Sequence, residues 1–362
     1  QPPRVPTMAE SNPDRYDHGT HLEALNRATG RLRSRHEGGD PTRPTRVWVD
    51  EDLTPDGMRS SLTIILDTGG CRWARAGGCT MCGYVSESEN AEGVSHEALL
   101  SQIKGALDYE AEEADSPADV VKLYSSGSIL DDREIGPETR AAVAETFADR
   151  ERIVIETLPD FVTADRLEPF LAAGLETDVA VGVETASDRV RHDCVNKYFD
   201  FEAVRAAAER AHGAGAGVKG YLLLKPPFLT EREAVEDAVQ SIERLAPLAH
   251  TISLNPTTVM EDTLVEELYH DGGYRPPWLW SVAEVLERTA EAEAIVVSDP
   301  VGAGSDRGPH NCGECDETVE RAIGDFNRRQ DPSVFGEVSC ECELTWEQVL
   351  QRERAYNMPL VD

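Results

Sequence analysis

Lysine is the residue type that this sequence most conspicuously lacks. Only five lysines occur among 362 residues, against 30 arginines, and 68 acidic residues bring the formal net charge to −33. An acidic, lysine-poor composition is typical of adaptation to a salt-rich cytoplasm, as in haloarchaea; an ordinary acidic enzyme is the alternative. The negative charge opposes general affinity for nucleic acids. Because molar salt shortens the Debye length to about 3 Å, the charge does not exclude an RNA substrate.

Long apolar runs and a leader segment are also missing. No apolar stretch reaches the roughly 18 residues of a membrane-spanning helix, so no membrane association is expected. The chain does not open on a charged-then-apolar leader, which predicts a cytoplasmic protein. Eight cysteines in that compartment indicate metal ligands before disulfides. The length suffices for one or two domains with a substantial core.

Three of the cysteines, Cys71, Cys79 and Cys82, follow an apolar strand-like run at Ser61–Leu66. Three thiolates are one short of a closed zinc or cubane site. On a [4Fe–4S] cluster they would leave one iron open to a small ligand, which is the signature of S-adenosylmethionine (AdoMet) radical chemistry. A zinc site completed by a distant His, or purely structural thiols, are the alternatives. The residues directly after Cys82 offer no further metal ligand.

The segments before the triad are polar. Residues 1–17 are proline-rich and read as a disordered arm, with Gln1 or Met8 as the start. A helix is predicted at His18–Arg35, since apolar residues recur there at helical spacing. It carries four arginines, which either pack on the barrel or contact RNA phosphates: Arg27, Arg31, Arg33 and Arg35. A short strand at Arg46–Val49 is expected at the barrel edge.

From residue 61 to about 299, apolar strands alternate with helical patterns. The predicted strands are Leu62–Leu66, Val120–Tyr124, Ile153–Thr157, Val179–Glu184, Val218–Leu224, Thr251–Leu254 and Ile295–Ser298. The predicted helices are His96–Glu113, Pro137–Asp149, Ala164–Ala173, Phe201–Ala211, Glu231–Leu245 and Pro277–Ala292. This alternation predicts an α/β fold, a partial or full parallel (βα) barrel. Barrel sites form at the carboxyl ends of strands, where the cysteine loop follows the first strand.

Polar residues at other strand ends are candidate ligands of AdoMet. Ser126, Gly127 and Ser128 follow the second strand, where small residues allow close backbone approach; an ordinary turn is the alternative. Glu184 ends the fourth strand and could accept ribose hydroxyls, or else form an ion pair with an arginine. Lys225 could meet the AdoMet carboxylate or a substrate phosphate, and Asn255 an adenine edge or the substrate. Either could instead be structural.

The composition changes after residue 300. Four cysteines follow a linker-like stretch, two on each side of a helix predicted at Glu317–Arg328: Cys312, Cys315, Cys340 and Cys342. Four soft ligands at this spacing favour tetrahedral zinc, with a second iron–sulfur cluster as the alternative. Trp346 and a helix to Tyr356 would complete the segment. The predicted divisions are 1–57 (arm, basic helix and edge strand), 58–300 (barrel) and 301–362 (Cys-rich metal-binding segment).

Taken together, these motifs resemble the archaeosine-forming radical AdoMet family. Seven residues separate Cys71 from Cys79, where the commonest AdoMet-radical pattern has three. The resemblance is carried by CTMCGY, YSSGSILD, VGVETASD, LLLKPPFLTE, SLNPTTV and SDPVGAGSDRGPHNCGECD. Through the motifs around the third cysteine and the fourth strand, it adds further residues expected around AdoMet: Met81, Tyr84, Ser187, Asn196 and Lys197. Cys194, in the same segment, is expected to be a small buried thiol.

The resemblance implies an activity that composition and periodicity do not reveal. A partner transferase attaches lysine to preQ0 at position 15 of archaeal tRNA. The radical subunit then cleaves the lysine carbon–nitrogen bond through a 5′-deoxyadenosyl radical, drawing electrons from an external donor, so that archaeosine remains. The alternatives are another tRNA-modifying radical enzyme, elongator-like or methylthiotransferase-like, and a non-catalytic iron–sulfur protein. The 62 residues from Val301 are too few for the acetyltransferase domain of the elongator type.

Overall fold

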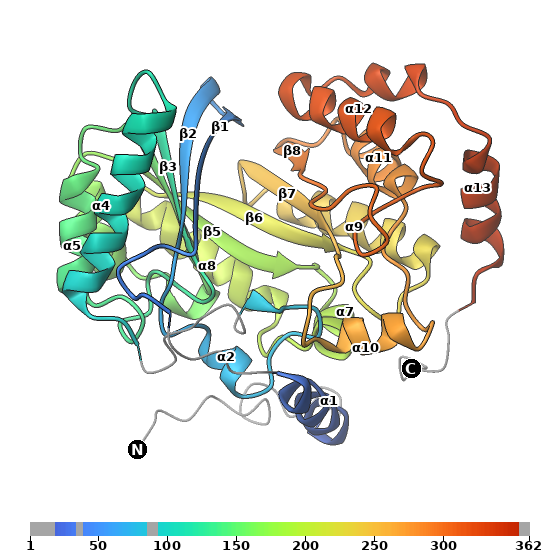
Figure 1. Cartoon of the computed structure of the whole chain (residues 1–362), viewed down its shortest axis with the longest axis horizontal. Coiled ribbons are helices and arrows are strands. Elements are labelled where there is room, and N and C mark those ends of the chain that lie inside the picture. Colours follow the sequence, from blue (N-terminus) through green and yellow to red (C-terminus); the bar gives the residue numbers. More distant parts are fainter. Residues whose placement is uncertain (1–18, 34–38, 85–92, 355–362) are drawn as a thin grey trace.

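One curved sheet of eight strands organises the protein (Figure 1). The computed structural model describes residues 19–33, 39–84 and 93–354. The strands follow one another across the sheet in chain order: β1 Arg46–Thr54, β2 Gly57–Leu66, β3 Val120–Ser125, β4 Arg152–Thr157, β5 Glu176–Glu184, β6 Gly217–Leu224, β7 Thr251–Pro256 and β8 Ile295–Ser298. β1 runs antiparallel to β2, and all the other neighbours are parallel.

Helices connect the parallel strands along the outer face of the sheet (Figure 1). The crossover helices are α4 His96–Glu113, α5 Pro137–Thr146, α6 Ala164–Ala172, α8 Phe201–Ala214, α9 Glu231–Leu245, α10 Leu264–His270 and α11 Leu279–Arg288. In the described part of the chain β1 and β8 are the two edges of the sheet and do not pair. The α/β prediction is therefore confirmed, with a partial barrel rather than a closed one.

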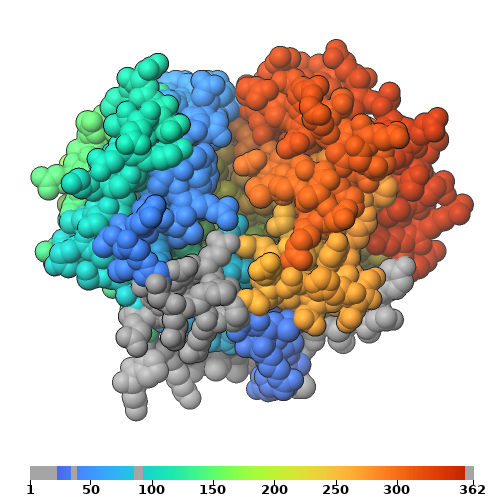
Figure 2. All heavy atoms as spheres, in the orientation of Figure 1, coloured from blue at the N-terminus to red at the C-terminus, as the bar shows by residue number. Residues whose placement is uncertain are grey.

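Side chains alternate along each strand between the outer face of the sheet, which forms the core with the helices, and the inner face, which lines the lumen. Leu62, Ile64 and Leu66 of β2 point outward into the main core with the helices and are at most 1% exposed. Burying each such side chain contributes roughly 1.5–3 kcal/mol. Ser61 and Thr63 alternate with them and face the lumen. Figure 2 shows the molecule hollowed between the β1–β2 hairpin and the C-terminal half, over the open edge of the barrel.

The C-terminal segment continues the core of the barrel. Helix α12 (Asp316–Arg329) packs on α11, and α13 (Cys342–Arg352) packs on α9. Trp346 of α13 is buried and donates from its indole nitrogen to the Ser281 hydroxyl of α11 at 2.8 Å. Trp346 belongs to the same hydrophobic core as Phe326 of α12 and the barrel, so packing stabilises the segment.

Several predicted boundaries shift in the structure. The basic helix is α1, Gly19–Leu32; His18 and Arg35 lie outside the described residues, as does the predicted N-terminal arm. The edge strand continues past Val49 to Thr54 and joins β2 through Gly57, whose φ of 103° suits glycine. The last helix ends at Arg352, and Tyr356 is outside the described part. Among the described helices, none has the length and apolarity to cross a membrane.

Candidate active site and metal centres

The cysteine loop lies at the carboxyl end of β2 and is held there by a distant segment. Cys71 precedes the short helix α2, Arg72–Arg75. Thr80 donates from its backbone to Val195 O at 3.0 Å and from its hydroxyl to Cys194 O at 2.6 Å. The Trp73 indole donates to Asn196 O at 2.6 Å. These bonds fix the loop to the π-helical turn Arg191–Val195, which follows β5.

Arg33, just after α1, holds the same loop from its other side. Its guanidinium donates to three loop carbonyls: Gly77 O at 2.6 Å, Cys82 O at 3.0 Å and Cys79 O at 3.1 Å. For Arg33, packing on the barrel is therefore the correct alternative of the two considered. Arg31 is exposed, and Arg27 forms an exposed ion pair with Glu23 at 3.6 Å.

The three thiols share a partly enclosed environment with two cations. Burial raises the pKa of Cys71 to about 11 and also raises the pKa values of Cys79 and Cys82. Lys197 opposes this shift at Cys79, and Arg33 opposes it at Cys82. Since the thiolate is the form that binds metal, the cations beside Cys79 and Cys82 favour metal binding there.

The spacing of the triad differs from that of a single-metal site. In the described residues, only the four tail cysteines form a group of three or more His, Cys, Asp or Glu ligands with all ligand atoms within 4.8 Å of one another. A single zinc ion would need ligands that close, because it binds them all directly. Thiolates on a cubane bind different irons and stand farther apart. The three triad sulfurs do not all lie within 4.8 Å of one another.

Glu184 is found in an ion pair at the mouth of the barrel. Its Oε1 lies 2.6 Å from Lys197 Nζ, and both side chains are largely buried. Its φ of 64° places it in the left-handed region, next to a bulge between Gly182 and Glu184. Such a backbone is costly for a residue other than glycine and is concentrated at functional sites. Glu184 therefore forms an ion pair, which was one of the two alternatives, but its partner is a lysine and not the expected arginine. The pair lies beside the cysteine triad.

Asn196 and Ser187 make local bonds that order this region. The fully buried Asn196 amide donates to Gly78 O at 2.7 Å and Asn26 Oδ1 at 2.8 Å, joining the cysteine loop to α1. The Ser187 hydroxyl caps a short helix by accepting from Val190 N at 3.3 Å. Both residues therefore support the site by shaping it. Cys194 is fully buried, as expected.

The Ser-Gly-Ser turn after β3 encloses a carboxylate that the sequence reading missed. Glu134 accepts from Ser128 N at 3.1 Å and from the Thr68 hydroxyl at 3.1 Å. A Cβ on Gly127 would stand 2.1 Å from a Glu134 oxygen, so any larger residue there would have to displace this carboxylate. Burial raises the pKa of Glu134 to about 7. The buried Ser126 hydroxyl has no hydrogen-bond partner among the described residues, which leaves it available to a ligand.

Glu156, at the end of β4, is a second overlooked carboxylate. It accepts from Ser125 N at 2.9 Å, and burial raises its pKa to about 8. The charges of Glu134 and Glu184 act on it, so the three carboxylates face one region. Its sequence signal was the same as that of Glu184: a charged residue directly after an apolar run at a strand end.

The remaining predicted ligands fall into three situations. Lys225 Nζ pairs with the fully buried Glu231 at 2.7 Å, which matches the structural alternative. The Asn255 side chain is half-buried at the end of β7, where it accepts from the Ser253 hydroxyl at 3.2 Å. Met81 packs against a small apolar cluster, while Tyr84 is 52% exposed.

The four tail cysteines converge on one point. Three of their Sγ–Sγ separations are 3.9 Å (Cys312–Cys315), 3.7 Å (Cys312–Cys340) and 3.6 Å (Cys315–Cys342). Zinc–sulfur bonds of about 2.3 Å in a tetrahedron place the sulfurs about 3.8 Å apart. The observed spacing matches one tetrahedral metal ion and is too small for thiolates on separate irons of a cubane.

Neighbouring donors support these thiols. The Trp280 indole donates to Cys342 Sγ at 3.3 Å, and the Asn311 amide donates to Cys315 Sγ at 3.4 Å. Hydrogen bonds to ligand sulfurs orient them and stabilise the thiolate form. The expected meeting of the four cysteines is confirmed, and zinc as the bound metal stays a prediction.

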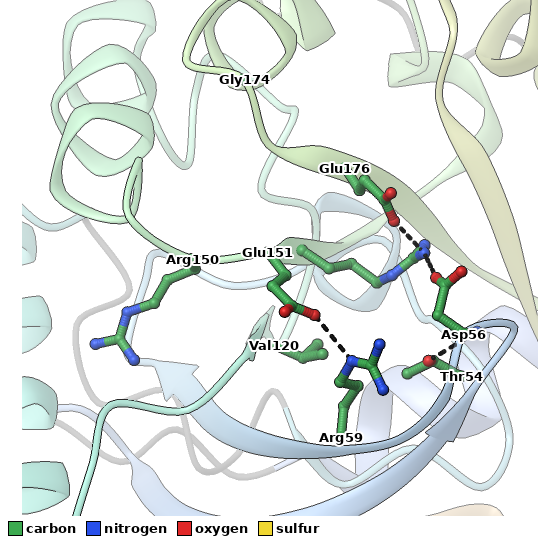
Figure 3. Close-up of a pocket in the computed structure, with 9 residues that line it drawn as sticks. Thr54, Asp56, Arg59, Val120, Arg150, Glu151, Gly174 and Glu176 are labelled. Carbon is green, nitrogen blue, oxygen red and sulfur yellow. Dashed lines mark hydrogen bonds and ion pairs between the residues drawn. The ribbon is translucent and has the colours of Figure 1, made fainter.

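A cavity of about 430 Å³ lies at the opposite, amino-terminal end of the strands. Charged residues from the β1–β2 turn and the starts of β4 and β5 line it (Figure 3). They pair with one another, as Arg59 does with Glu151 at 2.8 Å and Arg152 with Asp56 at 2.8 Å. Since the active sites of such barrels form at the carboxyl ends of the strands, this cavity is not the candidate site.

Fold and site together define an open α/β half-barrel protein with two cysteine centres. Over 349 residues the chain is 41% identical to archaeosine synthase subunit beta of Methanosarcina acetivorans, covering 94% of this chain and 100% of that protein. The subunit of the same description from Thermococcus kodakarensis is 39% identical over 313 residues, with 84% and 96% covered. The chain therefore belongs to the archaeosine synthase subunit beta family.

Two other comparisons are less informative. No protein-family model matches the chain. Among solved structures, the archaeal Elp3 of Methanocaldococcus infernus with an N-terminal deletion aligns at a TM-score of 0.48 and 17% identity. The alignment covers 63% of this chain and 59% of that one. This is a loose likeness, and the family assignment does not depend on it.

Proposed function

We propose that this protein is the radical AdoMet subunit that completes archaeosine in tRNA. A partner subunit of archaeosine synthase would first attach lysine to preQ0 at position 15, and this chain would then cleave the lysine carbon–nitrogen bond. The observation that carries the proposal is a cysteine triad, held by distant segments, at the mouth of an open half-barrel in a member of this family.

The residues present fit the cofactors that this activity requires. Cys71, Cys79 and Cys82 would hold a [4Fe–4S] cluster, with AdoMet along the carboxyl ends of β3 to β5. When bound and reduced by an external electron donor, the cluster and AdoMet together supply a 5′-deoxyadenosyl radical. The Ser126 hydroxyl, which has no partner among the described residues, and the Glu184 carboxylate would bind polar atoms of AdoMet.

The chain's own contribution is positioning and shielding. Lys197 and Arg33 place positive charge beside the triad, which stabilises thiolates. Glu134 and Glu156, with pKa values raised by burial to about 7 and about 8, are only partly ionised at neutral pH, which reduces the negative charge there. Zinc on the four tail cysteines would be structural, since all four of its ligand positions would be filled by protein.

Mass spectrometry of the products tests the activity. Purified chain with reconstituted cluster, AdoMet, a reductant and lysine-modified tRNA should yield archaeosine and 5′-deoxyadenosine. Replacing any one triad cysteine by Ala should abolish both products and the brown absorbance near ~400 nm expected of such clusters. Cys194→Ala is the matched control: this residue contacts the loop through its backbone carbonyl, which the substitution keeps, so both products and the absorbance should stay intact.

Deuterium on the lysine arm separates this mechanism from its rivals. A hydrogen taken from the arm should carry deuterium into the 5′-deoxyadenosine. If archaeosine forms while no lysine deuterium reaches that product, the proposed mechanism is wrong. A protein that binds iron but never cleaves AdoMet would instead be a structural iron–sulfur protein.

A further inference from the structure

Four of the five lysines lie inside the barrel or at its mouth. Lys122 of β3 is buried, Lys219 of β6 is half-buried, and Lys197 and Lys225 form the buried ion pairs described above. Only Lys104, on α4, is exposed. Lysine differs from arginine in being a compact point charge on a flexible stem. In a chain with 30 arginines, the lysines that remain are concentrated where a ligand would bind.

Lys219 differs from the other three interior lysines because its charge is not neutralised by a contact. Its ammonium lies 5.3 Å from the centre of the Tyr221 ring, which directs it along the lumen towards the carboxyl ends of the strands. Among the described residues no carboxylate lies within ion-pair distance of it. Lys122, by contrast, pairs with Asp52 of β1 at 2.5 Å. Burial and the nearby charge of Lys122 lower the pKa of Lys219 to about 8, while Asp52, Asp178 and Asp299 act in the opposite direction from beyond ion-pair distance.

A pair of tyrosines stands beside this free ammonium. The hydroxyls of Tyr124 and Tyr221 are 2.6 Å apart, and one of them donates to the other. Because two hydroxyls carry two hydrogens and the pair uses one, the second hydrogen is free to be donated outward. An ammonium and a hydroxyl donor side by side form a site for a carboxylate. Thr63, across the lumen, adds a buried hydroxyl with no partner among the described residues.

Carboxylates line the open edge of the barrel near the two lysines. Asp50 of β1 lies on the lumen face, and Asp299 directly follows β8 on the other edge. Burial and the charge of Asp50 raise the pKa of Asp299, so the two carboxylates interact across this edge. An ammonium group between them would relieve their repulsion. Figure 2 shows the hollow through which a substituent could enter between these edges.

We propose that the lumen binds the α-amino-carboxylate end of the substrate's amino-acid arm. The carboxylate of the arm would contact Lys219 and the tyrosine pair. The α-ammonium of the arm would lie towards Asp50 and Asp299. This rests on the proposed function, and it names the part of the substrate that this site recognises. Tyr221 lies three residues before the end of β6, about 10 Å below the mouth. A lysine arm whose ε-carbon is at the mouth extends its carboxylate towards this level.

Calorimetry with two small ligands tests the site without tRNA. One ligand is a synthetic amidine of preQ0 with the ε-nitrogen of L-lysine, and the other is the amidine with 1,5-diaminopentane, which lacks the α-carboxylate and otherwise matches the arm. The wild-type chain with its reconstituted cluster should bind the lysine amidine roughly tenfold more tightly, as expected for a hydrogen-bonded charge pair. Lys219→Met should reduce this ratio to about one, whereas the control Lys104→Met, at an exposed lysine, should keep it.

Two results would overturn the proposal: a wild-type chain that binds both amidines equally, or a Lys219→Met chain that keeps the preference. Thermal melting checks that the variant is folded, and Lys219→Gln replaces it if it is not. The assay with lysine-modified tRNA tests the proposed function separately from this binding site. Preference for the carboxylate without archaeosine formation would reject the proposed function, and archaeosine formation without the preference would reject this site.

Discussion

Gly127 shows how closely the residues at the carboxyl end of β3 are packed. The glycine leaves room for the Glu134 carboxylate, which is itself held by Thr68 and Ser128. Because both carboxylate oxygens have partners, the side chain cannot move aside cheaply. The small residues of this turn therefore leave space for the Glu134 carboxylate as well as for a ligand bound at the end of the strand.

Gly127→Ala should lower the free energy of unfolding by about 1–3 kcal/mol, the usual cost of overpacking. Urea denaturation followed by circular dichroism measures it. Gly213→Ala is the matched control: it lies exposed within helix α8, a Cβ there meets nothing within 4 Å, and it should not lower the stability. A Gly127→Ala chain as stable as this control would show that Glu134 is not held in place.

Arg33 acts on the cysteine loop through three carbonyls rather than through the thiols. A single guanidinium therefore orders the loop on both sides of Cys79. Its planar set of donors suits this role better than a lysine would.

Arg33→Ala should destabilise the loop by about 1–3 kcal/mol, the cost of leaving partners of a charged donor unsatisfied. The iron content after reconstitution should fall, and the midpoint potential of the cluster should shift, since a cation beside the thiolates is lost. Iron analysis and a redox titration measure the two effects. Arg31→Ala, at an exposed residue in the last turn of α1, should change neither; equal effects from both variants would contradict a specific role for Arg33.

At the scale of elements, the C-terminal segment depends on both its thiols and its packing. Cys312 and Cys315 precede α12, whereas Cys340 and Cys342 lie at the start of α13. A metal on these four thiols would close the loop formed by α12 and the turn after it. Trp346 and Phe326 would still hold the two helices against α9 and α11.

Metal analysis should find one zinc per chain in addition to cluster iron. Removing it with a chelator should expose α13 to limited proteolysis while the barrel stays intact, because most of the shared core comes from residues before 300. Cys340→Ala should give the same cleavage pattern without chelator, and Cys194→Ala should not. About eight irons and no zinc would instead identify a second cluster.

At the scale of the whole molecule, charge dominates the behaviour of the surface. With a net charge of −33, carboxylates repel one another across much of the exterior. The few cations placed inside, such as Lys122 with Asp52, are shielded from solvent and depend less on salt.

The melting temperature should therefore rise by several degrees from about 0.1 M to about 1 M KCl, as the Debye length falls from about 10 Å to about 3 Å. Differential scanning calorimetry measures the shift. Sucrose at matched osmolality does not screen charge and should stabilise the protein less. Equal stabilisation by sucrose and KCl would mean that surface repulsion is not the cause.

The sequence by itself determined the features that depend on local pattern. Apolar runs separated by helical patterns predicted the seven strands from β2 to β8. A strand that is covered on both faces is recognised by its own run of apolar residues, without knowledge of its neighbours. The cysteine spacing predicted both cysteine centres, since their ligands lie within short segments. Glu184 could be singled out because a charge ends an apolar run; Glu156 carried the same signal and was overlooked.

Only the tertiary structure decided which distant residues meet. Arg33 contacts a loop 44 to 49 positions away, and Lys197 reaches Glu184 only because a π-helical turn folds back beneath the triad. Lys122 and Lys219 share the lumen because parallel strands in register bring alternate residues to one face. Hydrophobic periodicity determines which face of a strand is buried, but the curvature of the sheet determines which charges then lie together.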